Sequence, residues 1–141
     1  MKKVICTIFV ISLLFTLPFT ASAVELESHT ATIMPRATIS LSFNPIQAGS
    51  TCIANEVYYI SDGDTLLNIS SCTWTPAGQD IMIGFQNVDT NTQYGVVYSG
   101  GEIRSKAIST GNLPDGDYRV IVVNYGTKSV TGTLRYSVTT K

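Results

Sequence analysis

The sequence is poor in the side chains on which most catalytic sites depend. It has one histidine, His29, and only 13% of its residues are charged. A Ser-His-Asp hydrolase needs a positioned imidazole base, but His29 lies in a polar stretch before the first expected strand, and no G-x-S-x-G motif is present. We therefore expect no enzymatic activity.

Positive charge is equally scarce. Once the leader described below is removed, seven lysines and arginines stand against ten acidic residues, a net charge of −3, and no basic cluster exists. Nucleic acids and anionic membranes are bound through clustered positive charge. The composition argues against both as main partners.

The first 23 residues have the organisation of a secretory signal peptide. Lys2 and Lys3 precede an apolar run over 4–19, and Ala21-Ser22-Ala23 forms a small-residue cleavage site. A retained membrane anchor is the alternative, but the run is shorter than the roughly 20 residues needed to span a bilayer. Val24 stands where a lipoprotein would have cysteine. We expect a bacterial-type chain that is secreted, or periplasmic if the source has an outer membrane, with no membrane span after cleavage.

The rest of the chain predicts a single domain of strands. Residues 24–36 are polar and aperiodic and are expected to form a flexible segment, and 37–141 are expected to form the domain. Short β-prone runs are separated by Gly, Pro, Asn and Asp at intervals typical of a sandwich or barrel. Strands are predicted over 38–43, 53–60, 65–71, 81–88, 93–98, 102–108, 118–123 and 130–139. Eight strands in about 100 residues favour two packed antiparallel sheets, an all-β, jelly-roll-like sandwich. The run 118–123 is apolar at both odd and even positions, as expected of a central strand covered on both sides.

Two cysteines remain after the leader and its Cys6 are lost. An even pair in an exported chain predicts a disulfide between Cys52 and Cys72. Ser61-Asp62-Gly63 matches a three-residue hairpin loop, and that register would place Cys52 opposite Cys72. A longer loop would shift the register, and two unpaired thiols are the alternative.

Alternating oxygen ligands occur at several turns. They are Asp62 and Asp64, Asp115 and Asp117, and the set Asn87, Asp89 and Asn91. Such residues favour turns because their side chains bond to nearby backbone. None of these sets is followed by the bidentate Glu of an EF-hand loop. We assign them to turns, with a calcium site at the four aspartates as the alternative, and expect no catalytic carboxylate pair and no other cofactor.

Aromatic residues leave one binding chemistry open. Seven tyrosines and Trp74 could stack against sugar rings. Trp74 follows Cys72 closely and could instead pack over the predicted bridge. Tyr94 and Tyr98 share a strand face with Val96, which favours a core position for them.

Two segments resemble a known family. The turn between apolar strands at 58–66 is similar to those of jelly-roll modules of secreted bacterial proteins. Residues 113–124 (LPDGDYRVIVVN), followed by 132–136 (GTLRY), resemble the end of a pre-peptidase C-terminal-type domain. The resemblance covers roughly residues 58–138 and implies an accessory module. Such modules are appended to enzymes, whereas this chain carries none, and no functional residue is transferred.

Together these patterns predict a secreted, non-enzymatic interaction module whose partner is an extracellular protein or glycan. One alternative is a carbohydrate- or calcium-dependent binding module of the cell envelope. Another is a small secreted toxin or bacteriocin-like factor.

Overall fold

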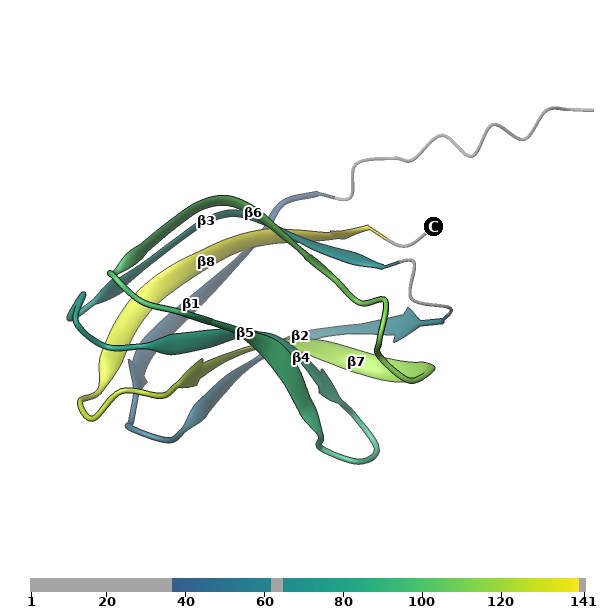
Figure 1. Ribbon diagram of the computed structural model, residues 1–141, viewed down its shortest axis with the longest axis horizontal. Coiled ribbons are helices and arrows are strands. Elements are labelled where there is room, and N and C mark those ends of the chain that lie inside the picture. The colour runs from purple at the N-terminus through teal and green to yellow at the C-terminus, as the bar shows by residue number, and fades with distance from the viewer. Residues whose placement is uncertain (1–36, 62–64, 140–141) are drawn as a thin grey trace, which may run out of the picture. The chain divides into compact units, whose positions relative to one another are not determined.

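The computed structural model describes residues 37–61 and 65–139, which contain eight strands and no helix (Figure 1). The strands are β1 (Ile39–Ile46), β2 (Thr51–Ile60), β3 (Leu66–Thr75), β4 (Ile81–Asn87), β5 (Gln93–Tyr98), β6 (Glu102–Ser109), β7 (Gly116–Asn124) and β8 (Val130–Thr139). Each overlaps a range for which the sequence predicted a strand. No helix in this part of the chain is long and apolar enough to cross a membrane.

The strands form two four-stranded antiparallel sheets. The first sheet has the order β1-β8-β3-β6 and the second sheet the order β2-β7-β4-β5. Figure 1 shows the two sheets as separate layers. Only the β4–β5 connection joins neighbours within one sheet, and the other connections cross between sheets. This is the topology of a jelly roll, so the predicted all-β sandwich is confirmed.

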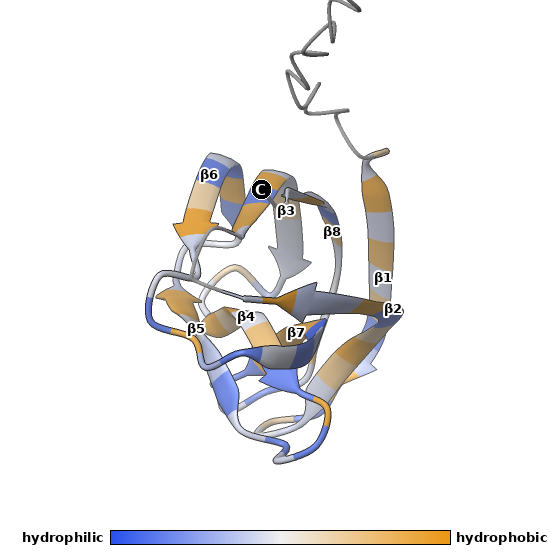
Figure 2. Ribbon diagram, turned by 90° about the vertical axis from the view of Figure 1, so that its right-hand side faces the viewer, coloured by the Kyte–Doolittle hydropathy of each residue, from blue (hydrophilic) through white to orange (hydrophobic). Residues whose placement is uncertain are grey.

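The core fills the space between the sheets. Alternate residues of each strand point inward, and in Figure 2 the hydropathy colours accordingly alternate along β1. The largest side chains with almost no exposure are Tyr118, Tyr136, Phe43, Phe85, Ile60 and Leu67. Trp74 also lies in this core, where its indole N–H donates to the carbonyl oxygen of Gln79 at 2.6 Å.

One buried asparagine ties together three segments at one end of the sandwich. The side-chain amide of Asn124 donates to the carbonyl oxygens of Ile46 (3.0 Å) and Lys128 (2.8 Å). Its side-chain oxygen accepts from the backbone N–H of Gly126 at 2.9 Å. The end of β1 and the β7–β8 turn are thus fixed to β7 by a side chain with no exposed surface.

The predicted β2–β3 hairpin is wrong. β2 pairs with β7, and β3 pairs with β6 and β8 in the other sheet. The connection after Ser61 therefore carries the chain from one sheet to the other. An Asp-Gly turn signal marks a change of chain direction, and it does not determine whether the next strand pairs with the previous one or packs against it from the facing sheet.

The predicted pairing of Cys52 with Cys72 is correspondingly not formed in the structure. Both are free thiols, Cys72 buried and Cys52 partly exposed. Cys52 lies on an edge strand of the second sheet, opposite Val122, while Cys72 lies on an interior strand of the first sheet. Both side chains pack against the core between the sheets, Cys72 from the first sheet and Cys52 from the second. Burial raises the pKa of the Cys72 thiol to about 12.

Several predictions fall on residues that the structure does not describe. They are the signal peptide over 1–23, the segment 24–36 with His29, and the turn residues Asp62 and Asp64.

Candidate binding site

The second sheet has apolar side chains buried on the face that points away from the core. Met82, Ile121 and Val123 form a separate cluster, each with at most 6% of its surface exposed. Val123 lies beside Met82 in the register of β7 and β4, and Ile121 lies beside Gly84. The prediction that β7 is covered on both sides is confirmed here.

The cluster is covered because the second sheet curls around its outer face. β2 and β5 are the opposite edges of this sheet, yet the Gln93 side-chain amide on β5 donates to the Thr51 hydroxyl on β2 at 3.2 Å. Two glycines permit this curvature. Gly84 and Gly95 are directly paired, and a Cβ on Gly84 would collide with the backbone of Tyr94 and Gly95. The outer face is therefore concave.

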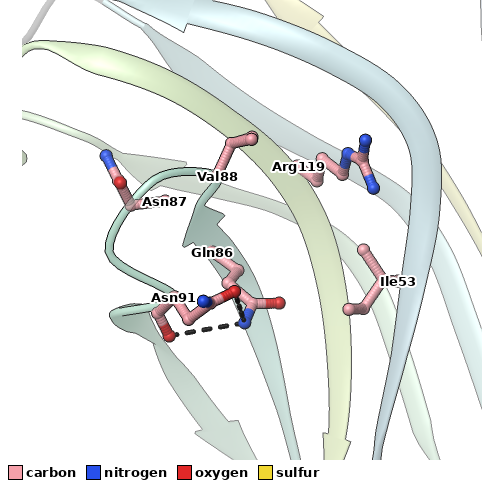
Figure 3. Close-up of a pocket in the computed structure, with 6 residues that line it drawn as sticks. All are labelled: Ile53, Gln86, Asn87, Val88, Asn91 and Arg119. Carbon is pink, nitrogen blue, oxygen red and sulfur yellow. Dashed lines mark hydrogen bonds between the residues drawn. The ribbon is translucent and has the colours of Figure 1, made fainter.

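A pocket of about 100 Å³ opens on this face (Figure 3). It is lined by Ile53, Gln86, Asn87, Val88, Asn91 and Arg119. Ile53, Gln86 and Arg119 come from β2, β4 and β7, while Val88 and Asn91 belong to the β4–β5 turn. In Figure 3 Gln86 lies between the turn and the strands that carry Ile53 and Arg119.

Asn87 builds the turn that forms one wall of the pocket. Its side-chain oxygen accepts from the backbone N–H groups of Asp89 (3.0 Å) and Thr90 (2.8 Å). Its backbone carbonyl accepts from the N–H of Asn91, which has a left-handed φ of 56°. The backbone N–H of Val88 donates to the backbone carbonyl oxygen of Asp117, and this hydrogen bond fixes the turn to β7. The assignment of Asn87, Asp89 and Asn91 to a turn is confirmed.

Two polar side chains in the pocket have groups free to bind a ligand. The Gln86 amide nitrogen donates weakly to the backbone and side-chain oxygens of Asn91, at 3.3 and 3.4 Å. Its carbonyl oxygen accepts no hydrogen bond from the described residues. Arg119 is exposed. Within residues 37–61 and 65–139 it forms no ion pair, whereas Arg104 pairs with Glu102. A guanidinium offers five donors in a planar fork that matches a carboxylate or two adjacent hydroxyl groups.

Exposed apolar side chains surround the pocket. Ile53, Val57, Tyr59 and Val88 are 42%, 47%, 63% and 37% exposed. Val57 pairs with Arg119 in the register of β2 and β7, and Tyr59 pairs with Asp117. We call the pocket and these four residues the binding face. Exposed apolar groups gathered on one surface are typical of interaction sites.

The other candidates from the sequence are dispersed. Asp115 and Asp117 are exposed at the start of β7, and no group of three or more His, Cys, Asp or Glu residues in the described part of the chain could hold a metal ion. Of the tyrosines, Tyr59 and Tyr125 are strongly exposed. They lie at opposite ends of β7, because Tyr59 pairs with Asp117 near its start and Tyr125 follows its last residue, Asn124. Tyr94 and Tyr98 pack against the core as expected, although Val96 on the same face is 44% exposed.

The sequence did not single out Gln86 or Arg119. One signal was present, because Arg119 is the only charged residue in a run that is otherwise apolar on both faces. A charge placed in such a strand indicates that its position opens to solvent or to a ligand.

Comparison with known proteins identifies no family. No protein-family profile and no curated protein matches the chain. Among solved structures, a family two carbohydrate esterase from Cellvibrio japonicus is similar at a TM-score of 0.31 and 10% identity. The match covers 74% of this chain but only 35% of the esterase.

Proposed function

We propose that this protein is a non-catalytic binding module and that it holds its ligand on the binding face. The observation that carries the proposal is the composition of the pocket. Its lining consists of amide, guanidinium and aliphatic groups, with no hydroxyl, thiol, imidazole or carboxylate side chain. Nucleophilic and general acid–base catalysis need such groups, whereas hydrogen bonding and apolar contact do not.

A glycan is the ligand that this chemistry fits best. Gln86, Asn91 and Arg119 present planar donors and acceptors suited to adjacent hydroxyl groups, and the exposed ring of Tyr59 offers an apolar surface for the C–H face of a sugar. A pocket of about 100 Å³ can hold the terminal sugar of a glycan but not a large cofactor. The guanidinium of Arg119, which forms no ion pair with the residues that the structure describes, favours a sugar that carries a carboxylate.

The sequence supports a site of action outside the cytoplasm. Residues 1–23 have the composition of a signal peptide, and the resemblance to accessory modules of secreted bacterial proteins agrees with it. We therefore place the glycan on a cell surface or in the extracellular medium.

The proposal is tested by screening the expected mature chain, residues 24–141, on an array of neutral and acidic glycans, with affinities from calorimetry. Arg119→Ala and Gln86→Ala should each weaken binding by roughly tenfold or more, since each removes hydrogen bonds to the ligand. The matched control is Arg135→Ala, which removes an exposed arginine of β8 from the other sheet. Binding that persists in both pocket variants, or no binding to any glycan, would refute the proposal.

Two further measurements separate the alternatives. Calorimetry with calcium, and glycan binding repeated in EDTA, show whether a cation takes part. Turnover of glycan or ester substrates by the purified chain would contradict a non-catalytic role.

A further inference from the structure

Three of the four edge strands carry features that prevent pairing with another chain. Exposed edges are usually protected by charges, proline or irregular register. β6 carries Glu102, Arg104 and Lys106, and its Ser105 has a left-handed φ of 47°. β1 contains Pro45 beside a register shift, and β2 has a register shift between Ile53 and Val57 that includes Glu56.

β5 is the edge strand without such protection. Its sequence from Gln93 to Tyr98 has no charge and no proline, and its register with β4 is regular. Gly95, Val96 and Val97 at its centre are exposed, the two valines by 44% and 52%. A regular, uncharged strand rich in β-branched and aromatic residues is a template for a further strand.

A groove lined by apolar and polar side chains lies beside this edge. It has a volume of about 440 Å³, and its lining includes the apolar Phe85, Tyr94, Val96, Ile108 and Leu113 and the polar Gln93, Ser109, Thr110 and Asn112. Ile108 belongs to β6, so the groove opens where the edges of the two sheets meet. A strand added to β5 would extend the second sheet over this opening and cover apolar surface that is otherwise in contact with water.

We propose that the strand added to β5 is β5 of a second copy of this chain, in antiparallel orientation. Directly opposed residues of an antiparallel pair point to the same face. With Val96 opposite Val96 of the partner subunit, Tyr94 faces Tyr98 of the partner subunit and Gly95 faces Val97 of the partner subunit. Tyr94 lines the groove, so this pairing brings Tyr98 of the partner subunit beside it, and each glycine is covered by a valine. Because the strand is uncharged, self-pairing brings no like charges together.

The dimer edge is distinct from the binding face, so this inference does not rest on the proposed function. Sedimentation of residues 24–141 over a range of concentrations should show a monomer–dimer equilibrium. Val96→Lys places two like charges on the symmetry axis and should raise the dimer dissociation constant by roughly tenfold or more. Val57→Lys is the control, because Val57 has a similar exposure on the opposite edge of the same sheet. A chain that stays monomeric, or a dimer that Val96→Lys leaves intact, overturns the proposal.

Cross-linking tests the register. In a Cys52→Ser background, Val96→Cys should give a disulfide-linked dimer on mild oxidation, because opposed residues of an antiparallel pair have Cα atoms about 4.5–5.5 Å apart. Val57→Cys in the same background should remain uncross-linked. Equal cross-linking by the two variants, or none by Val96→Cys, contradicts the pairing. A monomeric chain that instead binds a strand of another protein at β5 also overturns it.

Discussion

The buried side chain of Asn124 offers a quantitative test of the fold. In Asn124→Ala the carbonyl oxygens of Ile46 and Lys128 lose their donor, and the N–H of Gly126 loses its acceptor. A buried polar group left without a partner costs about 1–3 kcal/mol. Because the Lys128 and Gly126 groups lie nearer solvent, where water can replace part of the loss, we expect a total of about 2–4 kcal/mol. For a domain of this size the melting temperature should fall by roughly 10–20 °C.

Thermal unfolding of residues 24–141, followed by circular dichroism or calorimetry, measures this loss. The matched control is Asn44→Ala, because Asn44 is an exposed asparagine on β1. Asn124→Asp keeps the acceptor for Gly126 but removes both donors and brings a carboxylate beside two carbonyl oxygens. It should therefore be at least as destabilising at neutral pH and less so in acid. If the free energies of unfolding of Asn124→Ala and Asn44→Ala differ by less than about 0.5 kcal/mol, the hydrogen bonds of Asn124 do not stabilise these loops.

Three further predictions concern the glycines and the thiols. Gly84→Ala should destabilise the domain by about 3 kcal/mol or more, because its Cβ would meet the backbone of β5, whereas Gly78→Ala has open space and should be nearly neutral in the same denaturation assay. Burial raises the pKa values of the Cys72 thiol and the Tyr136 hydroxyl. The stability linked to their protonated forms is therefore complete below about pH 9 and is lost as the pH rises toward 12. The free energy of unfolding from urea titrations at pH 7, 9 and 10.5 should decline accordingly, and a flat profile would contradict this. In native protein at pH 8, a thiol reagent should label Cys52 slowly and Cys72 only after unfolding. Labelling of neither cysteine until a reductant is added would show that the two are bonded after all.

The sequence predicted the strands well because the physical signal for them is local. Alternation at Ile39, Leu41 and Phe43 reflects one buried and one exposed face. The apolar run over 118–123 predicted burial on both sides of β7, and the cluster on the outer face confirms it.

Strand partners could not be read from the sequence in the same way. The β2–β3 connection carries a turn signal whether the chain folds back in one sheet or crosses to the other. The hairpin register, and with it the placement of Cys52 opposite Cys72 on a neighbouring strand, rested on that one choice. The pocket was missed for a related reason, since Ile53, Gln86 and Arg119 meet only because β2, β4 and β7 belong to one curved sheet.

The pairing of β1 with β8 has a consequence for the order in which the fold is acquired. The ribosome produces β8 after β1 and β3, so the first sheet lacks the strand that joins these two until β8 has been made. Long-range pairing of this kind makes folding slow. Of the contacts between successive strands, only the β4–β5 hairpin can form early without waiting for distant sequence. Burial of the core between the sheets therefore waits for β7 and β8, which supply one inner strand of each sheet.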